Sequence, residues 1–559
     1  MHHVLKIILI ASIFAFGACK NEGHRKKEQI TKSISKPFVW EGANVYFLLT
    51  DRFNNGDPSN DIHFDRTKTT GKLRGFKGGD IKGITEKIEE GYFDDLGINA
   101  IWFTPIVEQI HGAVNEGTGN TYGYHGYWAK DWTALDPNFG TYTDLENMVS
   151  TAHEHGIRLI MDVVLNHTGP VTEKDPFWGE NWARQQPQCT YENYDSTVEC
   201  TLVANLPDIK TNSEKEVEIP PFLAEKWQNE GRYEQEIEEL DTFFTTTGLS
   251  KTPSNYLIKW VTDYVRDLGI DAYRVDTAKH VNEEVWTVLK KQATTAFTEW
   301  KKANPDKMLD DNRFFMLGEV YNYSINNGRN YDFSDKTVDY YAHGFDNLIN
   351  FQFKYDATGD YETMFNKYDS ILHNSLKEKS VLNYATSHDD GDPFDKNREK
   401  PYETGTKLLL TPGLSQVYYG DETARDLTIA GTEGDATLRS FMNWQSIDST
   451  ATQNILKHWQ KLGSFRRNHP SIGAGEHQMI TQEPYVFYRS FSQGNYKDEV
   501  VVGLDLPKGK KTLKTSTIFP EGSRLHDAYS GTETVVKDQK VTLNTSKTIV
   551  LLEKMSPIP

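Results

Sequence analysis

Short apolar segments alternate with amphipathic ones along most of this 559-residue chain, and this alternation restricts its fold more than any other feature. Apolar runs predict eight strands, at 45–50, 100–103, 158–164, 270–275, 314–317, 348–351, 381–386 and 416–419. Strands that are apolar throughout and alternate with helices indicate a parallel sheet covered on both faces. Eight such repeats predict an α/β fold, a (β/α)8 barrel, with polar residues at the strand ends marking its catalytic face.

Helix-boundary signals support this alternation. Thr252 is a good N-cap with Pro253 at the first helical position, and Gly269 stands where a helix commonly ends in a left-handed residue. Thr143 and Glu146 have the spacing of a capping box for a helix that ends at Gly156. A further helix is predicted over 83–96.

Two stretches depart from the alternation. Residues 169–251 are polar, acidic and irregular, so we predict a domain inserted after the third strand. From about Ser471 helical periodicity disappears, and short alternating or apolar runs between Gly, Pro and Asn turns predict an antiparallel β-sandwich. The expected boundaries are 37–168 and 252–470 for the barrel, 169–251 for the insertion and 471–559 for the C-terminal domain.

The N-terminus has the plan of an export signal. His2, His3 and Lys6 precede an apolar run over 7–16 that is too short to span a bilayer. The small residues before Cys19 resemble a bacterial lipoprotein cleavage box, which predicts a signal peptide over 1–18, a lipid anchor on Cys19 and a polar tether over 19–36. We therefore expect an exported, lipid-anchored outer-membrane lipoprotein; an ordinary cleaved signal with an incidental Cys is the alternative.

Composition limits the partners. A formal net charge of −19 argues against a nucleic-acid partner, which would require a basic patch. The 12 Trp and 28 Tyr suit a protein that stacks on sugar rings, although aromatic residues also fill cores. Cys189 and Cys200 lie close together in a loop-rich stretch, which suits a disulfide in an exported protein; two unpaired thiols are the alternative. We expect a monomer.

Three carboxylates stand at predicted strand ends. Asp276 ends the fourth strand, Glu319 the fifth and Asp389 the seventh, and in a barrel these ends converge on one mouth. Arg274 and Asp276 are two residues apart and so point to the same side of their strand. Taken alone, that pair is a structural ion pair. One ionised carboxylate with one protonated carboxyl is the equipment of a retaining glycosidase, and the Arg would keep the nucleophile ionised.

Two other sets of polar residues have candidate roles. His125, His167 and His388 lie at strand ends or in their loops and are neutral donors suited to sugar hydroxyls. The stretch 51–61 concentrates Asn, Asp and Gly, which is typical of a turn and is also a set of the hard oxygen ligands that calcium prefers.

These motifs resemble the α-amylase family, glycoside hydrolase family thirteen, from about Pro37 to the C-terminus. The matching signatures, all in the family's order, are 162–167 (DVVLNH), 206–209 (LPDI), 273–280 (YRVDTAKH), 318–320 (GEV) and 387–389 (SHD). The acidic insertion over 211–250 and the Cys pair are similar to the periplasmic α-amylases of enteric bacteria. Ser387 stands where many members have Asn, and the additional acid Asp390 follows the motif.

The resemblance implies the roles of the site residues. Asp276 would be the nucleophile, Glu319 the general acid/base and Asp389 the transition-state stabiliser, with the carboxyl groups of Asp276 and Glu319 ~5–5.5 Å apart. Tyr127 would be the platform under the distorted sugar ring. The remaining expected substrate contacts are His125, Trp128, His167, Arg274, Lys279, His280 and His388, of which Lys279 would reach the leaving-group sugars.

The resemblance also implies calcium as cofactor. Asn166, Asp208 and the carbonyl of His280 resemble the family's site between barrel and insertion. Asn55, Asp57, Asn60, Asp61, Gly78 and Asp80 resemble a second site of some bacterial members.

The implied activity is hydrolysis of α-1,4-glucosidic bonds in starch and maltodextrins through a covalent glycosyl-enzyme. A 4-α-glucanotransferase has the same three carboxylates and is the nearest alternative. A non-catalytic, surface-anchored glycan-binding lipoprotein is a more distant one, because it would be expected to lack one of them.

Overall fold

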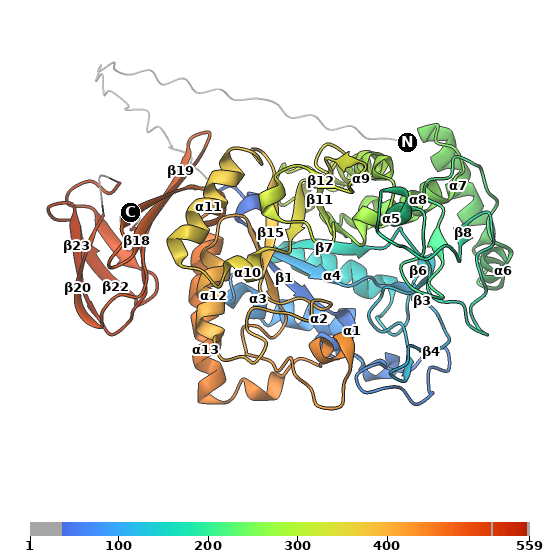
Figure 1. Cartoon of the computed structure of the whole chain (residues 1–559), viewed down its shortest axis with the longest axis horizontal. Helices are drawn as coiled ribbons and strands as arrows, with labels where there is room; N and C mark the ends of the chain where they lie inside the picture. The colour runs from blue at the N-terminus through green and yellow to red at the C-terminus, as the bar shows by residue number, and fades with distance from the viewer. Residues whose placement is uncertain (1–35, 516–517, 556–559) are drawn as a thin grey trace, which may run out of the picture. The chain divides into compact units, whose positions relative to one another are not determined.

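Eight parallel strands close into a barrel in this computed structural model, which describes residues 36–515 and 518–555 (Figure 1). Neighbours around the barrel follow the order β1-β16-β15-β14-β11-β10-β7-β2. The strands are β1 (Asn44–Leu48), β2 (Ala100–Phe103), β7 (Arg158–Val163), β10 (Ala272–Val275), β11 (Phe315–Gly318), β14 (Asn347–Asn350), β15 (Ser380–Tyr384) and β16 (Leu414–Tyr418). The predicted barrel is confirmed, and each predicted strand overlaps an observed one.

The predicted signal peptide, Cys19 and the tether up to residue 35 lie outside the described residues. Within the part of the chain that the structure describes, no helix combines the length and apolar character needed to cross a membrane.

Helices connect most of the barrel strands. They are α1 (Thr50–Phe53), α2 (Ile81–Glu89), α3 (Tyr92–Asp95), α4 (Tyr142–Glu154), α8 (Pro253–Leu268), α9 (Glu283–Ala303), α10 (Phe353–Asp356), α11 (Tyr361–His373) and α12 (Pro401–Leu410). Two more, α13 (Thr450–Asn468) and α14 (Ser471–Ala474), follow the last barrel strand, β16. The connection from β11 to β14 differs, because it forms a 3₁₀ turn (Ile325–Asn327) and the hairpin of β12 (Tyr331–Asp332) with β13 (Thr337–Val338) instead of an α-helix. The repeat is therefore less regular than the sequence predicted.

Helix boundaries agree in part with the predictions. Gly269 ends α8 with φ +81°, as expected, whereas the Thr252 side chain makes no capping bond. The capping box of α4 was misplaced by two residues: it is formed by Thr141 and Asp144, whose carboxylate accepts from the Thr141 backbone at 2.8 Å. The predicted helix over 83–96 is two helices, because Gly91, with φ +77°, separates α2 from α3.

The segment between β7 and α8 contains more regular structure than its polar sequence suggested. Its elements are β8 (Ala183–Arg184), α5 (Asp195–Val198), β9 (Asp208–Ile209), α6 (Pro221–Asn229) and α7 (Tyr233–Thr247). Leu223 and Trp227 are buried on α6, and Leu240 and Phe244 on α7. Each pair is four residues apart, so one narrow apolar stripe per helix holds the acidic insertion onto the protein. Between β2 and α4 lie β3 (Val107–Gln109), β4 (Val114–Asn115), β5 (Asn120–Thr121) and β6 (Ala129–Leu135).

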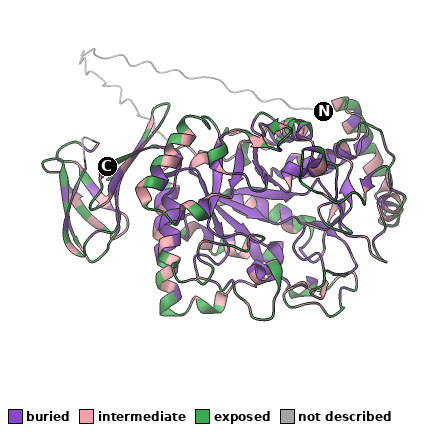
Figure 2. Cartoon of the chain, viewed as in Figure 1, coloured by how far each residue is buried: buried purple, intermediate pink, exposed green. Residues whose placement is uncertain are grey.

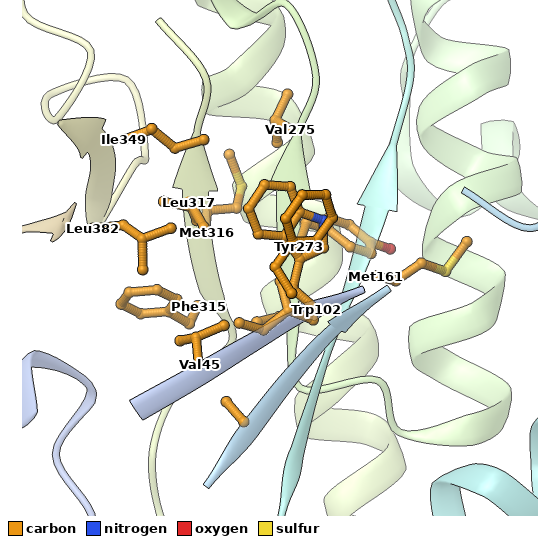
Figure 3. Packing of buried hydrophobic residues seen from close by; sticks show 14 of the residues in the cluster. Val45, Trp102, Met161, Tyr273, Val275, Phe315, Met316, Leu317, Ile349 and Leu382 are labelled. Carbon is orange, nitrogen blue, oxygen red and sulfur yellow. The ribbon is translucent and has the colours of Figure 1, made fainter. Parts of the chain in front are cut away.

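The core surrounds the barrel strands, which are buried along their whole length (Figure 2). Figure 3 shows part of this packing, with labelled side chains from β1, β2, β7, β10, β11, β14 and β15. Phe47 and Trp102 stack with ring centroids 3.7 Å apart, and Trp102 Nε1 donates to Asp162 Oδ2 at 3.0 Å. Tyr273, on the opposite face of β10 from Arg274, donates to the Val261 carbonyl of α8 at 2.7 Å. The strands thus carry polar groups only where these have partners.

The C-terminal region is an antiparallel β-structure of two sheets, as predicted. One sheet has the order β17-β18-β19-β24-β21-β22, and the other pairs β20 with β23. The strands are β17 (Glu476–Thr481), β18 (Val486–Gln493), β19 (Tyr496–Gly503), β20 (Gly509–Lys514), β21 (Arg524–Asp527), β22 (Thr532–Val535), β23 (Lys540–Thr545) and β24 (Val550–Lys554). Alternate buried residues such as Val501, Leu513, Val541 and Leu552 form a separate core.

Candidate active site

A cavity of about 700 Å³ lies where Asp276, Glu319 and Asp389 follow their strands. The barrel, the inserted segment and the loops after β5 and β16 all contribute to its wall. Of the residues expected to be catalytic or to bind substrate, only Arg274 does not line it. The expected residues on the wall are His125, Tyr127, Trp128, His167, Asp276, Lys279, His280, Glu319, His388 and Asp389.

Arg274 joins the carboxylates. Its Nη1 lies 2.7 Å from Asp276 Oδ1, and its Nη2 lies 2.9 Å from Glu319 Oε2. Nη1 also lies 3.0 Å from Asp162 Oδ1, because Arg274 of β10 and Asp162 of β7 face each other in the strand register. Three carboxylates around one buried guanidinium raise the pKa of Arg274 well above its usual value, although burial alone would lower it. The guanidinium is therefore permanently charged, and it holds Asp276 and Glu319 close to each other.

Asp162 was not predicted as a site residue. Its Oδ2 accepts from Trp102 Nε1 at 3.0 Å and from the Tyr127 hydroxyl at 2.8 Å, so it positions the ring of Tyr127. Burial raises its pKa to about 7, while Arg274 opposes this rise. The available signal was a lone acid inside the apolar run 158–164, since a buried carboxylate needs a partner.

The pKa values of Glu319 and Asp389 are shifted in opposite directions. Burial, with Asp276 and Asp389 nearby, raises the pKa of Glu319 well above its usual value, against the effect of Arg274. Its Oε2 also accepts from the Thr277 backbone N–H at 2.8 Å. Burial alone would raise the pKa of Asp389 too, but His388 and the Ser387 hydroxyl, which donates at 2.7 Å, lower it below the usual value. The surroundings thus favour the protonated form of Glu319 and the ionised form of Asp389.

The three predicted histidines are kept neutral. Burial lowers the pKa of His125 well below its usual range, that of His388 to about 4, and that of His167 by a smaller amount. His125 Nδ1 accepts from the Tyr127 backbone N–H at 3.0 Å, and the His388 ring stacks on Tyr127 at 5.3 Å. Neutral rings around one tyrosine can donate to hydroxyl groups without adding charge.

Aromatic side chains surround Lys279. Its Nζ lies 5.1 Å from the Tyr321 ring centroid and 5.7 Å from that of Tyr191, and both tyrosines are about half exposed on the cavity wall. Tyr191 belongs to the loop that a disulfide between Cys189 and Cys200 closes in the structure. Neither tyrosine was predicted: Tyr191 lies in the folded insertion, and Tyr321 comes from the residues that follow β11. Other unpredicted wall residues are Arg74, Glu116, Thr121, Leu202, Val203, Leu206, Thr277, Asn322, Asp435 and Arg439.

The oxygen ligands of the first expected calcium site lie together. The Asn166 amide is 2.9 Å from the His280 carbonyl and 3.3 Å from Asp208 Oδ1, and its other end is 3.3 Å from His167 Nδ1. His167 is neutral, and its Nε2 faces the Tyr127 carbonyl at 3.0 Å, so Nε2 carries the proton and Nδ1 is an acceptor. The Asn166 nitrogen therefore belongs at Nδ1, which turns its oxygen toward the other two. Three oxygens facing one another fit a hard cation such as Ca²⁺.

The second expected calcium site fits in part. Among the described residues, the buried Oδ1 atoms of Asn55 and Asn60 have no hydrogen-bond partner. Asp61 Oδ1 lies 2.9 Å from Asn55 Nδ2. Gly78 has φ +85°, and a Cβ there would lie 2.4 Å from both of those side chains, so only glycine allows this close approach. Two orphan amide oxygens beside a carboxylate suit a cation.

Two of the expected ligands of that site are engaged elsewhere. The Asp80 carboxylate accepts from the backbone N–H groups of Gly56, Asp57 and Gly83 and thereby caps α2. Asp57 Oδ1 accepts from the backbone and hydroxyl of Ser59. Within the described residues there is no group of three or more His, Cys, Asp or Glu side chains that could hold a metal, so each candidate site combines a carboxylate with amide or backbone oxygens.

Comparison with known proteins agrees with this geometry. The alpha-amylase catalytic-domain model matches residues 47–461. The periplasmic alpha-amylase of Escherichia coli strain K12 is 35% identical, over 87% of this chain and 76% of that protein. A cyclomaltodextrin glucanotransferase of Thermoanaerobacterium thermosulfurigenes is 27% identical, over 86% of this chain and 62% of its own length. The crystal structure of an Anoxybacillus alpha-amylase shares the fold, with a TM-score of 0.63, 23% identity and coverage of 93% of this chain and 100% of that one.

The family match spans more than half of the chain, and it includes Asp276, Glu319 and Asp389 at the cavity. This match shows that the chain belongs to the alpha-amylase family.

Proposed function

We propose that this protein is an α-amylase that hydrolyses α-1,4-glucosidic bonds in starch and maltodextrins with retention of configuration. The observation that carries the proposal is the Arg274 guanidinium, which contacts Asp276 at 2.7 Å and Glu319 at 2.9 Å in one cavity. The raised pKa of Glu319 supports its role as a protonated acid beside a paired carboxylate.

The first step uses both acids. Asp276 attacks the anomeric carbon, and a bond forms between that carbon and the carboxylate oxygen while the bond to the glycosidic oxygen breaks. Glu319 gives its proton to that leaving oxygen, so the departing chain leaves as a neutral alcohol. The product of this step is a glycosyl ester on Asp276.

The second step reverses the proton transfer. Glu319, now ionised, takes a proton from water, and the hydroxide oxygen bonds to the anomeric carbon as the ester bond to Asp276 breaks. Asp389 and the neutral histidines would hold the hydroxyls of the distorted ring, with Tyr127 under it. The lowered pKa of Asp389 supports this, because an ionised acceptor suits sugar hydroxyls.

A glucanotransferase is the second candidate. Tyr191 and Tyr321 beside Lys279 would hold an acceptor sugar, and the relatives include a cyclomaltodextrin glucanotransferase. The two activities differ in whether water or a sugar hydroxyl attacks the glycosyl ester.

Product analysis distinguishes these activities. Protein lacking residues 1–19 is incubated with a linear maltodextrin, and chain lengths, new reducing ends and the anomer released are followed over time. New reducing ends in the α configuration with linear products are expected. Redistributed or cyclic chains without new reducing ends would show transfer, β products would show inversion, and binding without turnover would leave a glycan-binding lipoprotein.

We also propose that Ca²⁺ binds Asn166, Asp208 and the carbonyl of His280. The ion would supply positive charge that holds the end of β7, the insertion and the residues after β10 together. The unsatisfied oxygens of Asn55 and Asn60, with Asp61 and the close approach at Gly78, support a second site. The same incubation with a calcium chelator is expected to lower activity and thermal stability together.

Export, lipid attachment at Cys19 and outer-membrane location are part of the proposal, supported by the N-terminal sequence and by the periplasmic relative. The domain boundaries at 168/169, 251/252 and 470/471, and a monomeric state, are proposed with them. Metabolic labelling with palmitate, compared between the natural chain and Cys19→Ser, tests the anchor.

A further inference from the structure

Asp208 lies between two segments of the chain, and its two carboxylate oxygens face different partners. In the sheet of β8 and β9 it is paired directly with Arg184, and on its other side it forms a bridge with His167, which follows β7. Residues directly opposite each other in an antiparallel pair project from the same face, so the side chains of Arg184 and Asp208 lie together. Asp208 Oδ2 lies 3.0 Å from Arg184 Nε, whereas Oδ1 lies 3.3 Å from the Asn166 amide.

The contact between Arg184 and Asp208 is buried and is one of charge. The two side chains are 12% and 2% exposed. Among the described residues, neither Arg184 Nε nor Asp208 Oδ2 has a hydrogen-bond partner, so their attraction does not depend on an aligned bond. Opposite charges attract more strongly where little water separates them. Arg184 therefore supplies positive charge to the carboxylate that is proposed to bind Ca²⁺.

Further contacts hold the guanidinium of Arg184 in place. Its Nη2 donates to Asn212 Oδ1, and its Nη1 lies 3.6 Å from Glu199 Oε2. The Glu199 side chain is 48% exposed, so water weakens that second ion pair. Asp208 is thus the buried anion that Arg184 balances, and the positive charge has a fixed place beside it.

We infer that Arg184 regulates the affinity of the proposed cation site by competing with Ca²⁺ for the charge of Asp208. The guanidinium lies on Oδ2, so it repels a divalent cation held on Oδ1 and keeps Oδ2 from serving as a further ligand. Without the cation, the same guanidinium balances the buried carboxylate. The inference rests on the Ca²⁺ site proposed at Asn166, Asp208 and the carbonyl of His280.

Competition with a fluorescent calcium chelator of known affinity tests the inference. Each variant starts loaded with Ca²⁺, so none has to fold without the ion, and Asp208→Asn identifies the ion that belongs to this site. Arg184→Gln is expected to bind that ion ~10-fold tighter than the natural protein, which corresponds to about 1.4 kcal/mol. Arg184→Lys keeps the positive charge and is expected to keep the natural affinity.

Lys210→Gln is the matched control. It removes the same charge from the same surface cavity, two residues from Asp208, but Lys210 Nζ donates to the Glu180 carbonyl. It is expected to leave the Ca²⁺ affinity close to that of the natural protein. An equal gain from Lys210→Gln would mean that overall charge, rather than the contact with Asp208, sets the affinity, and it would overturn the inference.

Thermal unfolding gives a readout that does not depend on activity. In excess chelator, Arg184→Gln is expected to unfold at a lower temperature than the natural protein, because its buried carboxylate has lost its counter-charge. Saturating CaCl₂ is expected to raise the unfolding temperature of Arg184→Gln by more than that of the natural protein, since tighter binding stabilises more. An equal rise in both proteins, or an unchanged or weaker affinity in Arg184→Gln, would overturn the inference.

Failure of the proposed Ca²⁺ site gives a different result. If Asp208→Asn, folded by circular dichroism, retains as many Ca²⁺ ions as the natural protein, the proposed site is wrong and the inference falls with it. If Asp208→Asn loses one ion and Arg184→Gln does not bind that ion more tightly, only the role of Arg184 is wrong. These measurements do not involve turnover, so their outcome is independent of the proposed hydrolysis.

Discussion

Buried arginines occupy both ends of the barrel, and their surroundings are opposite. At the mouth, Arg274 contacts three carboxylates, which raise its pKa well above the usual value against the effect of burial. At the base, Arg466 and Arg489 face mainly neutral groups: Arg466 donates to the carbonyls of Leu409 and Thr411, for example.

At the base, burial is the main influence on the pKa of both arginines. It lowers the pKa of Arg466 to about 9 and that of Arg489 to about 10. Arg489 donates to the carbonyls of Leu410 and Ile472 and so joins the C-terminal sheet to the end of α12 and to α14. The same type of side chain thus serves two purposes. At the mouth it fixes the positions of acids, and at the base it satisfies carbonyl groups where two parts of the fold meet.

The largest expected effect comes from the mouth. Asp276→Ala removes the proposed nucleophile and should lower kcat/KM on maltodextrin by ~10⁴-fold or more, since residues that act as a unit lose most of their effect together. The circular dichroism spectrum should be retained. Residual turnover within about tenfold of the natural protein would rule out the nucleophile assignment.

Arg274→Met should damage both activity and stability. It leaves buried acids without their cation, which costs about 3–5 kcal/mol of unfolding free energy, and it removes a fixed charge from the site, worth on the order of 10²–10³ in turnover. Urea denaturation and initial rates measure the two effects. A variant of normal activity would mean that Asp276 and Glu319 keep their positions without the guanidinium.

Arg489→Met is the matched change at the base. It removes hydrogen bonds to two carbonyl groups and should cost about 1–3 kcal/mol of unfolding free energy. Because none of its partners lines the catalytic cavity, kcat/KM below the unfolding transition should be unchanged. Loss of activity in the folded variant would show that the two ends of the barrel are coupled.

The smallest effect is a pH dependence at the base. His469 Nδ1 lies 2.8 Å from Asp498 Oδ1 and its Nε2 2.7 Å from Glu553 Oε2. Burial opposes its charge, but these two acids raise its pKa above the usual value. The folded state therefore binds the proton more tightly than the unfolded one. The stabilisation is complete below the unfolded pKa of about 6.5 and is lost as the pH rises through the folded pKa.

Urea denaturation of the natural protein and of His469→Gln across this range measures that contribution. The difference between their unfolding free energies should be largest on the acid side and shrink as the pH rises. A constant difference would mean that the histidine acts through packing alone.

The features that could be predicted are those that a local sequence pattern determines. Apolar runs followed by Asp276, Glu319 and Asp389 place these residues at strand ends, and the barrel topology brings the ends together. The sequence did not predict that Asp162 pairs with Arg274, because that contact depends on the register between β7 and β10. The helices α6 and α7 were missed, although Leu223 with Trp227 and Leu240 with Phe244 have helical spacing, because the surrounding acidic residues obscured so narrow a stripe.

Two further differences from the prediction concern the capping box of α4 and Tyr191. Thr141 with Asp144 and Thr143 with Glu146 both have the spacing of a capping box, and the chain uses the first. Tyr191 could not be assigned to the site, because its place beside Lys279 depends on how the loop between Cys189 and Cys200 folds.

The Asn166 amide couples the proposed cation site to the glucan-binding cavity. One end of it contacts His167, a side chain of the sugar cavity, and the other faces the oxygens of Asp208 and His280. Turning the amide over would break both arrangements at once. A cation at the proposed site would hold the amide oxygen and so keep the amide nitrogen on Nδ1 of the His167 ring. By thermodynamic reciprocity, a glucan that prefers this arrangement must raise the affinity for the cation by the same factor that the cation raises affinity for the glucan.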